Sequence, residues 1–256
     1  MTSTSAPVTD LLSSNSPQRL GGIIVEDLVF GYPEHPPILN HLSLTIRPGE
    51  RVALLGPTGT GKSTLMEHLV GLKKPETGKI YIQGKLVEPN SLWEIRQQIG
   101  FCFQNPADQL FMPTIFDDVI FGPCNYGVPA PVAVKRAEKL LSQLGLSDCA
   151  QRACHRLSGG QKRLAALATV LALEPTILIL DEPTAGLDPL WRRYLIKVLE
   201  QLPVQILLIV SHNLNWIRKT TDRALILSEG KIQVDQPTSR LLEQEQLLES
   251  YGLPLD

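Results

Sequence analysis

The sequence predicts an α/β fold that combines a parallel sheet with an antiparallel β subdomain and an inserted helical subdomain. Residues 176–180 and 205–210 are apolar runs of strand length, and a helical stretch at 190–202 separates them, as in a parallel sheet. A third apolar run, residues 51–55, leads into a glycine-rich loop and then into helical spacing at residues 62–70. These segments form the predicted core.

Short strands are expected around this core near the N-terminus. Residues 23–25, 42–46 and 80–82 are apolar or alternating runs, punctuated by Pro-Gly and Gly-Lys turns. This pattern is typical of an antiparallel sheet.

The middle of the chain differs in character from both ends. From about residue 95 to 160 strand-like runs are scarce, and residues 131–144 show an amphipathic helical pattern. We therefore expect a helical insertion there. Two further strands are expected at residues 224–227 and 231–234, followed by a last helix at 239–248.

Size and composition indicate one folded domain. The chain has 256 residues, of which 43% are hydrophobic and 20% charged, so we expect a single domain over residues 21–256. Residues 1–20 are rich in Ser, Thr and Pro and do not resemble a secretion signal. They are interpreted as a flexible tail.

Charge, hydropathy and cysteines limit the partners and the compartment. The net charge of -2 provides no overall basic field for a nucleic acid, so none is expected as a partner. The strongest apolar runs have strand length, far short of the roughly 20 residues of a membrane-spanning helix. The four cysteines form no CxxC pair, which favours reduced thiols and a cytoplasmic protein.

Residues 56–63, Gly-Pro-Thr-Gly-Thr-Gly-Lys-Ser, match the phosphate-binding loop (P-loop) between a strand and a helix. The glycines let successive backbone N–H groups point at phosphate oxygens, beside the positive end of the helix dipole. Lys62 is expected to reach the β- and γ-phosphates, and the Ser63 hydroxyl to bind Mg²⁺. A glycine-rich turn before a helix is the alternative. The expected nucleotide contacts here are Gly56, Pro57, Thr58, Gly59, Thr60, Gly61, Lys62, Ser63 and Thr64.

Asp181 and Glu182 follow four apolar residues, so we expect them at the exposed carboxyl end of a buried strand, where open α/β sheets bind ligands. Asp181 suits a water-mediated contact with Mg²⁺. Glu182 is placed to orient and deprotonate a water that attacks the γ-phosphate. Two solvated acids at a strand end are the alternative, and the P-loop upstream favours the catalytic interpretation.

Residues 157–161 read Leu-Ser-Gly-Gly-Gln. Ser158 as N-cap, with Gln161 three residues later, predicts a capping box for a helix that ends near Leu173. A capped helix start that contains Gly159 and Gly160 also exposes backbone N–H groups, which makes it a second phosphate-binding device. The two interpretations are compatible.

With these three motifs the chain resembles the ATP-binding cassette (ABC) family of transport ATPases, from about residue 23 to 252. The resemblance implies the ABC ATPase fold, a RecA-like P-loop NTPase core with an inserted helical subdomain, and ATP and Mg²⁺ as cofactors. It also implies a head-to-tail dimer, with an identical or a different second subunit. In that dimer Ser158, Gly159, Gly160 and Gln161 of one subunit cap the ATP that the P-loop of the other holds.

Four further positions match family elements. Tyr32 matches the aromatic residue that stacks on adenine, with a strand-end tyrosine as the alternative. Gln104 matches the glutamine that contacts Mg²⁺ and lines the groove facing a membrane subunit. Asp188 matches the loop that crosses the dimer interface, and before Pro189 it also suits a helix cap. His212 matches the switch histidine that contacts the γ-phosphate, and with Glu182 and Lys62 it completes the expected catalytic set.

Residues 103–111 and the segment after them are similar to the ATPases of energy-coupling factor importers, which take up cobalt, nickel or vitamins. The resemblance implies a peripheral subunit on the cytoplasmic face of the cell membrane, a transmembrane coupling subunit that docks near Gln104, and a separate substrate-capture membrane subunit. Leu164, where many relatives have arginine one place after Arg163, and Asn213, where aspartate is frequent, depart from the family. These departures favour a divalent metal over a vitamin.

Two other functions stay open on the sequence. One is a cassette ATPase outside transport, in DNA repair, translation or complex assembly, which the single cassette and the lack of heptad runs disfavour. The other is a small-molecule kinase with the same P-loop, which the signature at 157–161 and the lack of an evident acceptor pocket disfavour.

Overall fold

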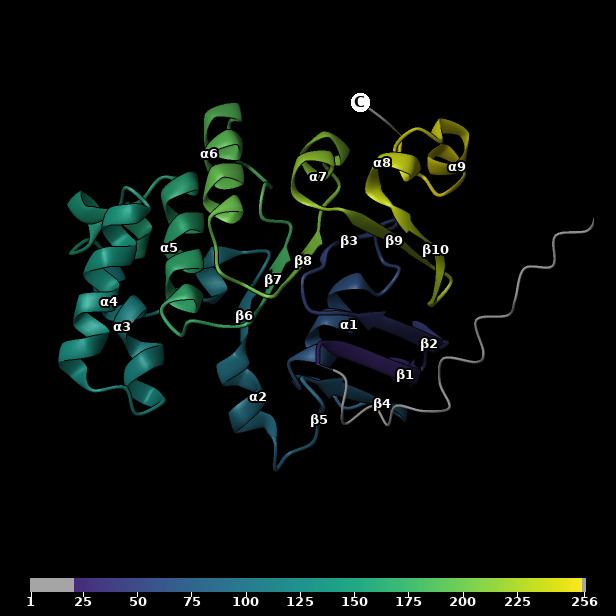
Figure 1. The fold of residues 1–256 in the computed structure, drawn as a ribbon, viewed down its shortest axis with the longest axis horizontal. Coiled ribbons are helices and arrows are strands. Elements are labelled where there is room, and N and C mark those ends of the chain that lie inside the picture. Colours follow the sequence, from purple (N-terminus) through teal and green to yellow (C-terminus); the bar gives the residue numbers. More distant parts are fainter. Residues whose placement is uncertain (1–20, 255–256) are drawn as a thin grey trace, which may run out of the picture.

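The computed structural model describes residues 21–254, so the tail expected at residues 1–20 lies outside the described residues. Two sheets and the helices around them follow the predicted order (Figure 1). The strands are β1 (Ile23–Phe30), β2 (Leu39–Ile46), β3 (Arg51–Leu55), β4 (Thr77–Ile82), β5 (Lys85–Leu86), β6 (Ile99–Cys102), β7 (Ile177–Asp181), β8 (Ile206–Val210), β9 (Arg223–Ser228) and β10 (Lys231–Pro237). The helices are α1 (Lys62–Leu69), α2 (Leu92–Gln98), α3 (Ile115–Asn125), α4 (Ala130–Gln143), α5 (Gly159–Leu171), α6 (Pro189–Glu200), α7 (Leu214–Thr220), α8 (Thr238–Leu241) and α9 (Glu245–Ser250).

The smaller sheet has the order β2-β1-β4-β5, and every pair in it is antiparallel. This confirms the predicted N-terminal β subdomain. Its strands are longer than expected because their outer residues are polar yet still pair with neighbouring strands, as Glu26 does with Lys79. The apolar face of this sheet packs with α1 in one core, which includes Ile23, Leu65 and Met66.

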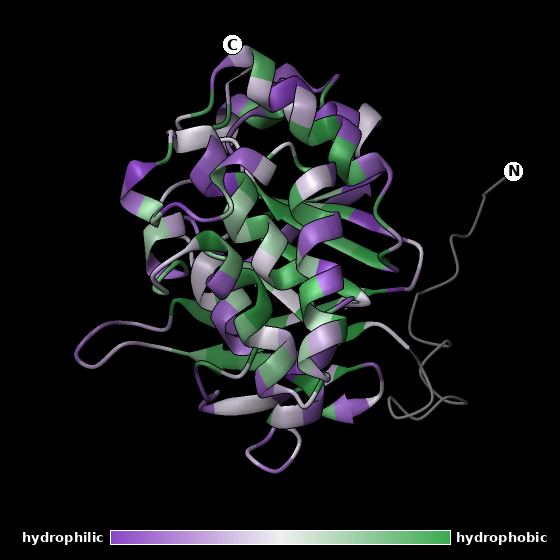
Figure 2. Cartoon of the chain, turned by 90° about the vertical axis from the view of Figure 1, so that its left-hand side faces the viewer, coloured by the Kyte–Doolittle hydropathy of each residue, from purple (hydrophilic) through white to green (hydrophobic). Residues whose placement is uncertain are grey.

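The larger sheet has the order β10-β9-β3-β8-β7-β6 and is parallel except at β10, which pairs antiparallel with β9. All residues of β7 and β8 are buried, because both faces of the sheet are covered. Ile177 and Ile179 face the core shared with α1, whereas Leu178 and Leu180 face the core shared with α5, α6 and α7. Figure 2 shows these hydrophobic strands enclosed by helices.

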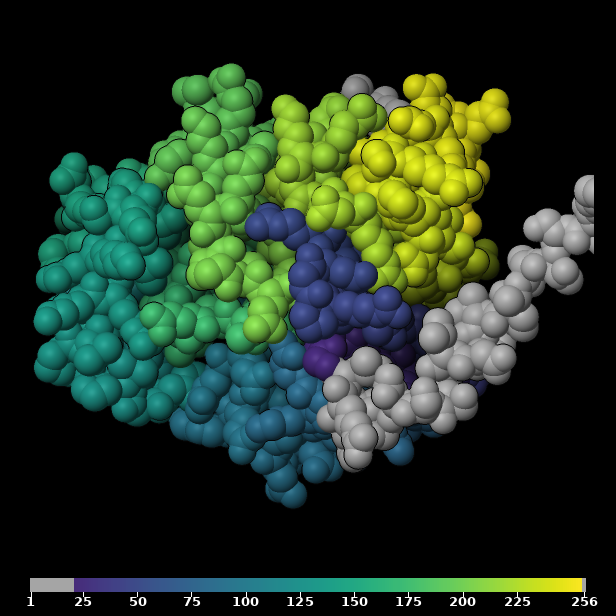
Figure 3. Space-filling model, in the orientation of Figure 1, coloured from purple at the N-terminus to yellow at the C-terminus, as the bar shows by residue number. Residues whose placement is uncertain are grey.

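The helical insertion begins later than the sequence predicts. Residues 99–102, inside the expected insertion of about 95–160, form β6, the edge strand of the parallel sheet beside β7. This strand has only four residues and one of them is a glycine, so its local pattern is weak, and it is recognised as a strand by its pairing with β7. The helical region after it, with α3 and α4 against α5, forms one end of the molecule (Figure 3).

The last predicted helix, residues 239–248, is two short helices, α8 and α9. The break between them lets Leu241, Leu242, Leu248 and Leu253 all reach the same core, where each is at most 4% exposed.

Two remaining expectations concern membrane spans and thiols. Among residues 21–254, no helix has the length and apolar character that a bilayer span requires. The four cysteines, all within the described range, are free thiols. Burial raises the pKa of the Cys102 thiol to about 12, although the positive charge of Arg163 opposes this.

Candidate active site

One cavity of about 290 Å³ gathers half of the residues predicted to bind nucleotide, together with Asp181, Glu182 and His212. It opens where β7 and β8 end, beside the N-terminus of α1. Its walls come from segments far apart in the sequence, because the carboxyl ends of parallel strands meet at one edge of a sheet. The lining residues are Tyr32, Ile38, Thr58, Gly59, Gly61, Lys62, Ser63, Thr64, Gln104, Asp181, Glu182, Val210 and His212.

The P-loop wraps around the ammonium group of Lys62. Lys62 Nζ donates hydrogen bonds to the carbonyl oxygens of Gly56 (2.8 Å) and Pro57 (2.7 Å). Burial lowers the pKa of Lys62, while the negative charges of Glu182 and Asp181 oppose that shift. Gly56 has φ 146°, and a Cβ there would lie 2.2 Å from the carbonyl oxygen of Leu227, so only glycine fits. The loop therefore holds a cation at its centre, as a triphosphate requires.

Three oxygen-bearing side chains meet where Mg²⁺ was predicted. Ser63 Oγ donates to Asp181 Oδ2 over 2.9 Å, and Gln104 lines the same cavity. Burial raises the pKa of Asp181, partly offset by the Ser63 hydrogen bond and the charge of Lys62. A hydroxyl beside a carboxylate fits Mg²⁺, which prefers hard oxygen ligands and takes only one or two from protein when phosphates supply others. Within residues 21–254, no group of three or more His, Cys, Asp or Glu side chains is placed to hold a metal ion on its own.

Asp181 and Glu182 lie at the carboxyl end of β7, where the sequence predicts them, and both line the cavity. They are nevertheless buried, with exposed fractions of 6% and 9%, unlike two solvated acids at a strand end. Among the described residues, no group hydrogen-bonds Oε1 of Glu182, which lies 3.5 Å from Nε2 of His212. Burial raises the pKa of Glu182, partly offset by a hydrogen bond from the backbone of His212. Burial lowers the pKa of His212, and the charge of Lys62 lowers it further. A buried carboxylate oxygen with a free lone pair is suited to take a proton from water.

The capping box at the start of α5 is present. Ser158 Oγ accepts from the backbone N–H of Gln161 (3.2 Å), and the Gln161 side chain accepts from the backbone N–H of Ser158 (3.0 Å). Gly160 packs so closely on Trp191 that a Cβ there would come within 2.9 Å of the indole ring, which leaves room only for glycine. The same box ties the exposed Ser158-Gly159 start of α5 in place.

Asp188 caps α6, as predicted. Its Oδ1 accepts from the backbone N–H groups of Leu190 and Trp191, both at 2.9 Å, and Pro189 takes the first helical position. Asp188 is exposed, as is Leu190 with 71% of its surface accessible. The structure describes Asp188 and residues 158–161, and none of them lines the P-loop cavity.

A family model described as ABC transporter matches residues 39–185, more than half of the chain. The matched range holds the P-loop, the α5 capping box and the Asp181-Glu182 pair. The chain belongs to the ABC transporter family. This ABC ATPase is therefore an ATP-binding subunit of an ABC transporter and hydrolyses ATP, as the family does.

Curated relatives and solved structures agree with the family. The energy-coupling factor transporter ATP-binding protein EcfA of Methanothermobacter thermautotrophicus is 39% identical, over 91% of this chain and 76% of its own. The structure of cbiO1 from Clostridium perfringens, part of the ABC transporter complex cbiONQ, has a TM-score of 0.78 and 31% identity, covering 92% of this chain and 96% of its own.

A dimeric ATP-binding cassette in a post-hydrolysis state, bound to ADP and Pi, has a TM-score of 0.75 and 27% identity, covering 84% of this chain and 98% of its own. Other relatives, at 42% and 43% identity, carry only the general name of an ABC transporter ATP-binding protein. Together these confirm the ABC ATPase fold that the motifs predict.

Tyr32 of the ABC ATPase lies where the P-loop cavity meets a second cavity of about 420 Å³. Its hydroxyl is 3.2 Å from Thr64 Oγ1, and its ring packs edge-to-face on Phe30 at 5.3 Å between centroids. Tyr32 is 38% exposed, and Lys73 Nζ lies over its ring, 5.0 Å from the centroid. Stacking on adenine stays a prediction that this placement supports.

Several residues of the ABC ATPase site were missed or misjudged from sequence. Ile38 and Val210 line the cavity, yet nothing in their local sequence distinguishes them from core residues. Leu164, where relatives have arginine, is a core residue with 3% exposure. Asn213 caps α7 by accepting from the N–H of Trp216 (2.9 Å), which aspartate also does, so this departure is structurally neutral.

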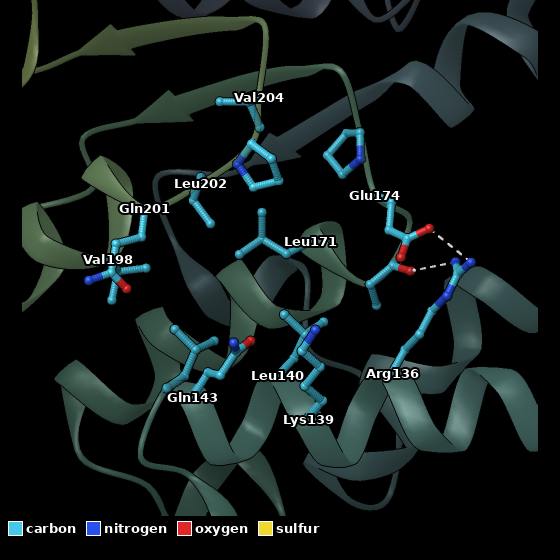
Figure 4. A pocket seen from close by; sticks show the side chains of 14 residues that line it. Arg136, Lys139, Leu140, Gln143, Leu171, Glu174, Val198, Gln201, Leu202 and Val204 are labelled. Atoms are coloured by element: carbon cyan, nitrogen blue, oxygen red, sulfur yellow. Dashed lines mark hydrogen bonds and ion pairs between the residues drawn. The ribbon is translucent and has the colours of Figure 1, made fainter.

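A cavity of about 420 Å³ lies away from this site, between α4, the end of α5 and α6 (Figure 4). Leucines such as Leu140 and Leu171 line it, and Arg136 pairs with Glu174 at 2.8 Å on its rim. Although it is larger than the P-loop cavity, it contains none of the predicted site residues.

The raised pKa of Glu182 predicts the pH dependence of the ABC ATPase. As the predicted base, Glu182 would act only when deprotonated, and an ordinary glutamate has a pKa of about 4.3. When the solution is acidified, a carboxylate with a raised pKa takes up its proton at a higher pH than an ordinary glutamate. Activity is therefore lost at that higher pH. We expect the acid limb of kcat/KM for ATP hydrolysis, which reports the free enzyme, to lie above the ordinary glutamate value. Steady-state assays between about pH 4.5 and 8, with circular dichroism at each pH to verify folding, test this. An acid limb at the ordinary value contradicts it.

Proposed function

We propose that this chain powers an importer of energy-coupling factor type, which takes up a metal ion (cobalt or nickel) or a vitamin through separate membrane subunits. The names of the EcfA and cbiO1 relatives support this branch of the family. One observation supports coupling between ATP hydrolysis and a membrane subunit: a single segment joins the P-loop cavity to an exposed aromatic surface. Gln104 lines the cavity, and Phe111, further along the same segment, is 65% exposed.

In this proposal the cavity residues divide the work of hydrolysis. The P-loop and Lys62 bind the β- and γ-phosphates, and Ser63, Asp181 and Gln104 hold Mg²⁺, which when bound supplies positive charge to the phosphates. Glu182 accepts the proton of the attacking water, and His212 contacts the γ-phosphate from the end of β8. The adenine stacks on Tyr32.

The second phosphate-binding device supports a head-to-tail dimer. Residues 158–161 and Asp188 stand outside the cavity of their own chain, and Ser158, Gly159 and Asp188 are exposed. A second subunit, the same chain or a different one, brings its α5 N-terminus to the ATP held by Lys62. ATP then favours the closed dimer because both subunits supply donors to its phosphates, and hydrolysis removes that preference.

The aromatic surface is the docking site that we propose for the transmembrane coupling subunit. Phe111 and Phe121 pack edge-to-face with centroids 5.1 Å apart, and Trp93 packs on Tyr126 at 4.6 Å. Phe121 and Trp93 are 43% and 55% exposed. Paired aromatic side chains exposed together favour contact with a partner protein. The chain is then a peripheral subunit on the cytoplasmic face of the membrane, and a separate membrane subunit captures the substrate.

The docking surface predicts the behaviour of Phe121→Glu. A carboxylate at the centre of an apolar contact is desolvated on binding, so we expect at least about a tenfold loss of membrane-bound protein. ATP hydrolysis by the isolated subunit is expected to stay within about twofold, because Phe121 is remote from the P-loop cavity. Val132→Glu is the matched control, since Val132 is 42% exposed on α4 and belongs to neither aromatic pair.

The measurement is fractionation of native membranes together with uptake of radiolabelled cobalt, nickel and vitamins. Phe121→Glu should lose both membrane binding and uptake of one substrate, while Val132→Glu keeps both. Undiminished membrane binding of Phe121→Glu would refute the docking surface. A cell that lacks this chain and still takes up every substrate normally would refute the import function.

A further inference from the structure

Arg163, on α5 directly after the capping box, bonds to three backbone carbonyl groups. Its Nη1 donates to the carbonyl oxygen of Glu182 at 2.7 Å. Its Nη2 donates to the carbonyl oxygens of Ala185 at 3.1 Å and Gln104 at 3.2 Å. One guanidinium group therefore ties α5 to the loop that carries Glu182 and to the segment that carries Gln104.

The backbone that Arg163 contacts at Glu182 has an unusual conformation. Glu182 has φ 46°, in the left-handed region that residues other than glycine seldom adopt. Its N–H donates to the carbonyl oxygen of Val210 (2.9 Å), and its carbonyl oxygen also accepts from the N–H of Ala185 (3.1 Å). Such conformations persist where the surroundings hold them, and they concentrate at functional sites. Of the two donors to the Glu182 carbonyl oxygen, Ala185 belongs to the same loop, whereas Arg163 reaches it from α5.

The chemistry of arginine suits this position. A guanidinium group is planar, stays charged and presents several donors in a fixed fork, so it can bond to several carbonyl groups at once. The neighbouring Leu164 faces the core and has no donor. A lysine in place of Arg163 would bring one ammonium group, without the planar fork that spans all three carbonyl groups.

We propose that Arg163 is a positioning residue for ATP hydrolysis: it holds the backbone of Glu182 and Gln104 so that their side chains face the same nucleotide. This inference rests on the proposed role of Glu182 as the base. It also ties the α5 N-terminus, the part that meets the ATP of a second subunit, to the Glu182 of its own chain.

The first test compares Arg163→Ala and Arg163→Lys. A misplacement of about 1 Å at a reacting group costs about 100-fold in rate, so we expect Arg163→Ala to lower kcat about 100-fold. The KM for ATP should stay within about threefold, because Lys62 and the P-loop remain in place. Arg163→Lys should recover part of the loss. Arg136→Ala is the matched control: Arg136 Nη1 donates to the carbonyl oxygen of Ala172, just after the other end of α5.

The second test combines Arg163→Ala with Glu182→Gln. If Arg163 acts through Glu182, its replacement should cost less than about threefold in the Glu182→Gln background, since residues that act as a unit are not additive. A full 100-fold loss in both backgrounds would overturn the proposal, as would an unchanged kcat in Arg163→Ala. If Arg163→Ala does not fold, Arg163→Lys in both backgrounds gives the same comparison. Normal hydrolysis by Glu182→Gln alone would instead refute the proposed role of Glu182.

Discussion

Glu182→Gln is expected to lower kcat for ATP hydrolysis by about 10²- to 10⁴-fold, the range that a general base contributes. The amide keeps the size and shape of the side chain but cannot accept a proton from water. The change replaces one carboxylate oxygen with an NH₂ group and removes the negative charge of the buried carboxylate, whose Oε1 lies 3.5 Å from His212 Nε2. ATP binding should be retained, because Lys62 and the P-loop are untouched.

The same variant should accumulate as an ATP-bound dimer, because the step that releases the two subunits is blocked. Phosphate release measures the rate, and analytical ultracentrifugation with saturating ATP and Mg²⁺ measures the dimer. Glu174→Gln is a matched control: Glu174 also has a left-handed φ, 53°, but pairs with Arg136 far from the P-loop. Glu182→Gln that stays monomeric under these conditions would contradict the proposed cycle.

Lys62→Met is expected to weaken ATP binding by about 10²- to 10³-fold. Lys62 Nζ is the buried cation at the centre of the P-loop, and a hydrogen bond between charged groups contributes about 1.5–3 kcal/mol, to which its attraction for the other phosphate oxygens adds. Methionine keeps the length and apolar stem but has no charge. Titration calorimetry with ATP and Mg²⁺ measures the affinity.

Loss of the Lys62 charge should also change the pKa values of Asp181 and Glu182. Its positive charge lowers the pKa of Asp181 and of Glu182, so its removal should raise the pKa of both and move the acid limb of any residual activity to higher pH. Lys139→Met is the control, since Lys139 lies on the rim of the remote cavity. An ATP affinity of Lys62→Met within about threefold of the original protein would rule out the assigned phosphate contact.

The predicted fold is confirmed where local patterns are strong. β3 coincides with the expected strand at residues 51–55 because its apolar run ends at a glycine loop, which marks the boundary. β6 was missed because its short, glycine-containing sequence becomes a strand only beside β7. The break between α8 and α9 was missed because residues 242–244, Leu-Glu-Gln, contain no glycine or proline that would mark it.

For the site, the sequence by itself determined the chemical groups: the P-loop with Lys62, the acids after β7, and the capping box at Ser158. These depend on spacing along a few residues, which backbone geometry translates directly into loops, strand ends and helix starts. Only the tertiary structure decided that Glu182 is buried, that Ser63 bonds to Asp181, and that Arg163 reaches three carbonyl groups. Those contacts join residues far apart in the chain, so they depend on which strands lie side by side and where each one ends.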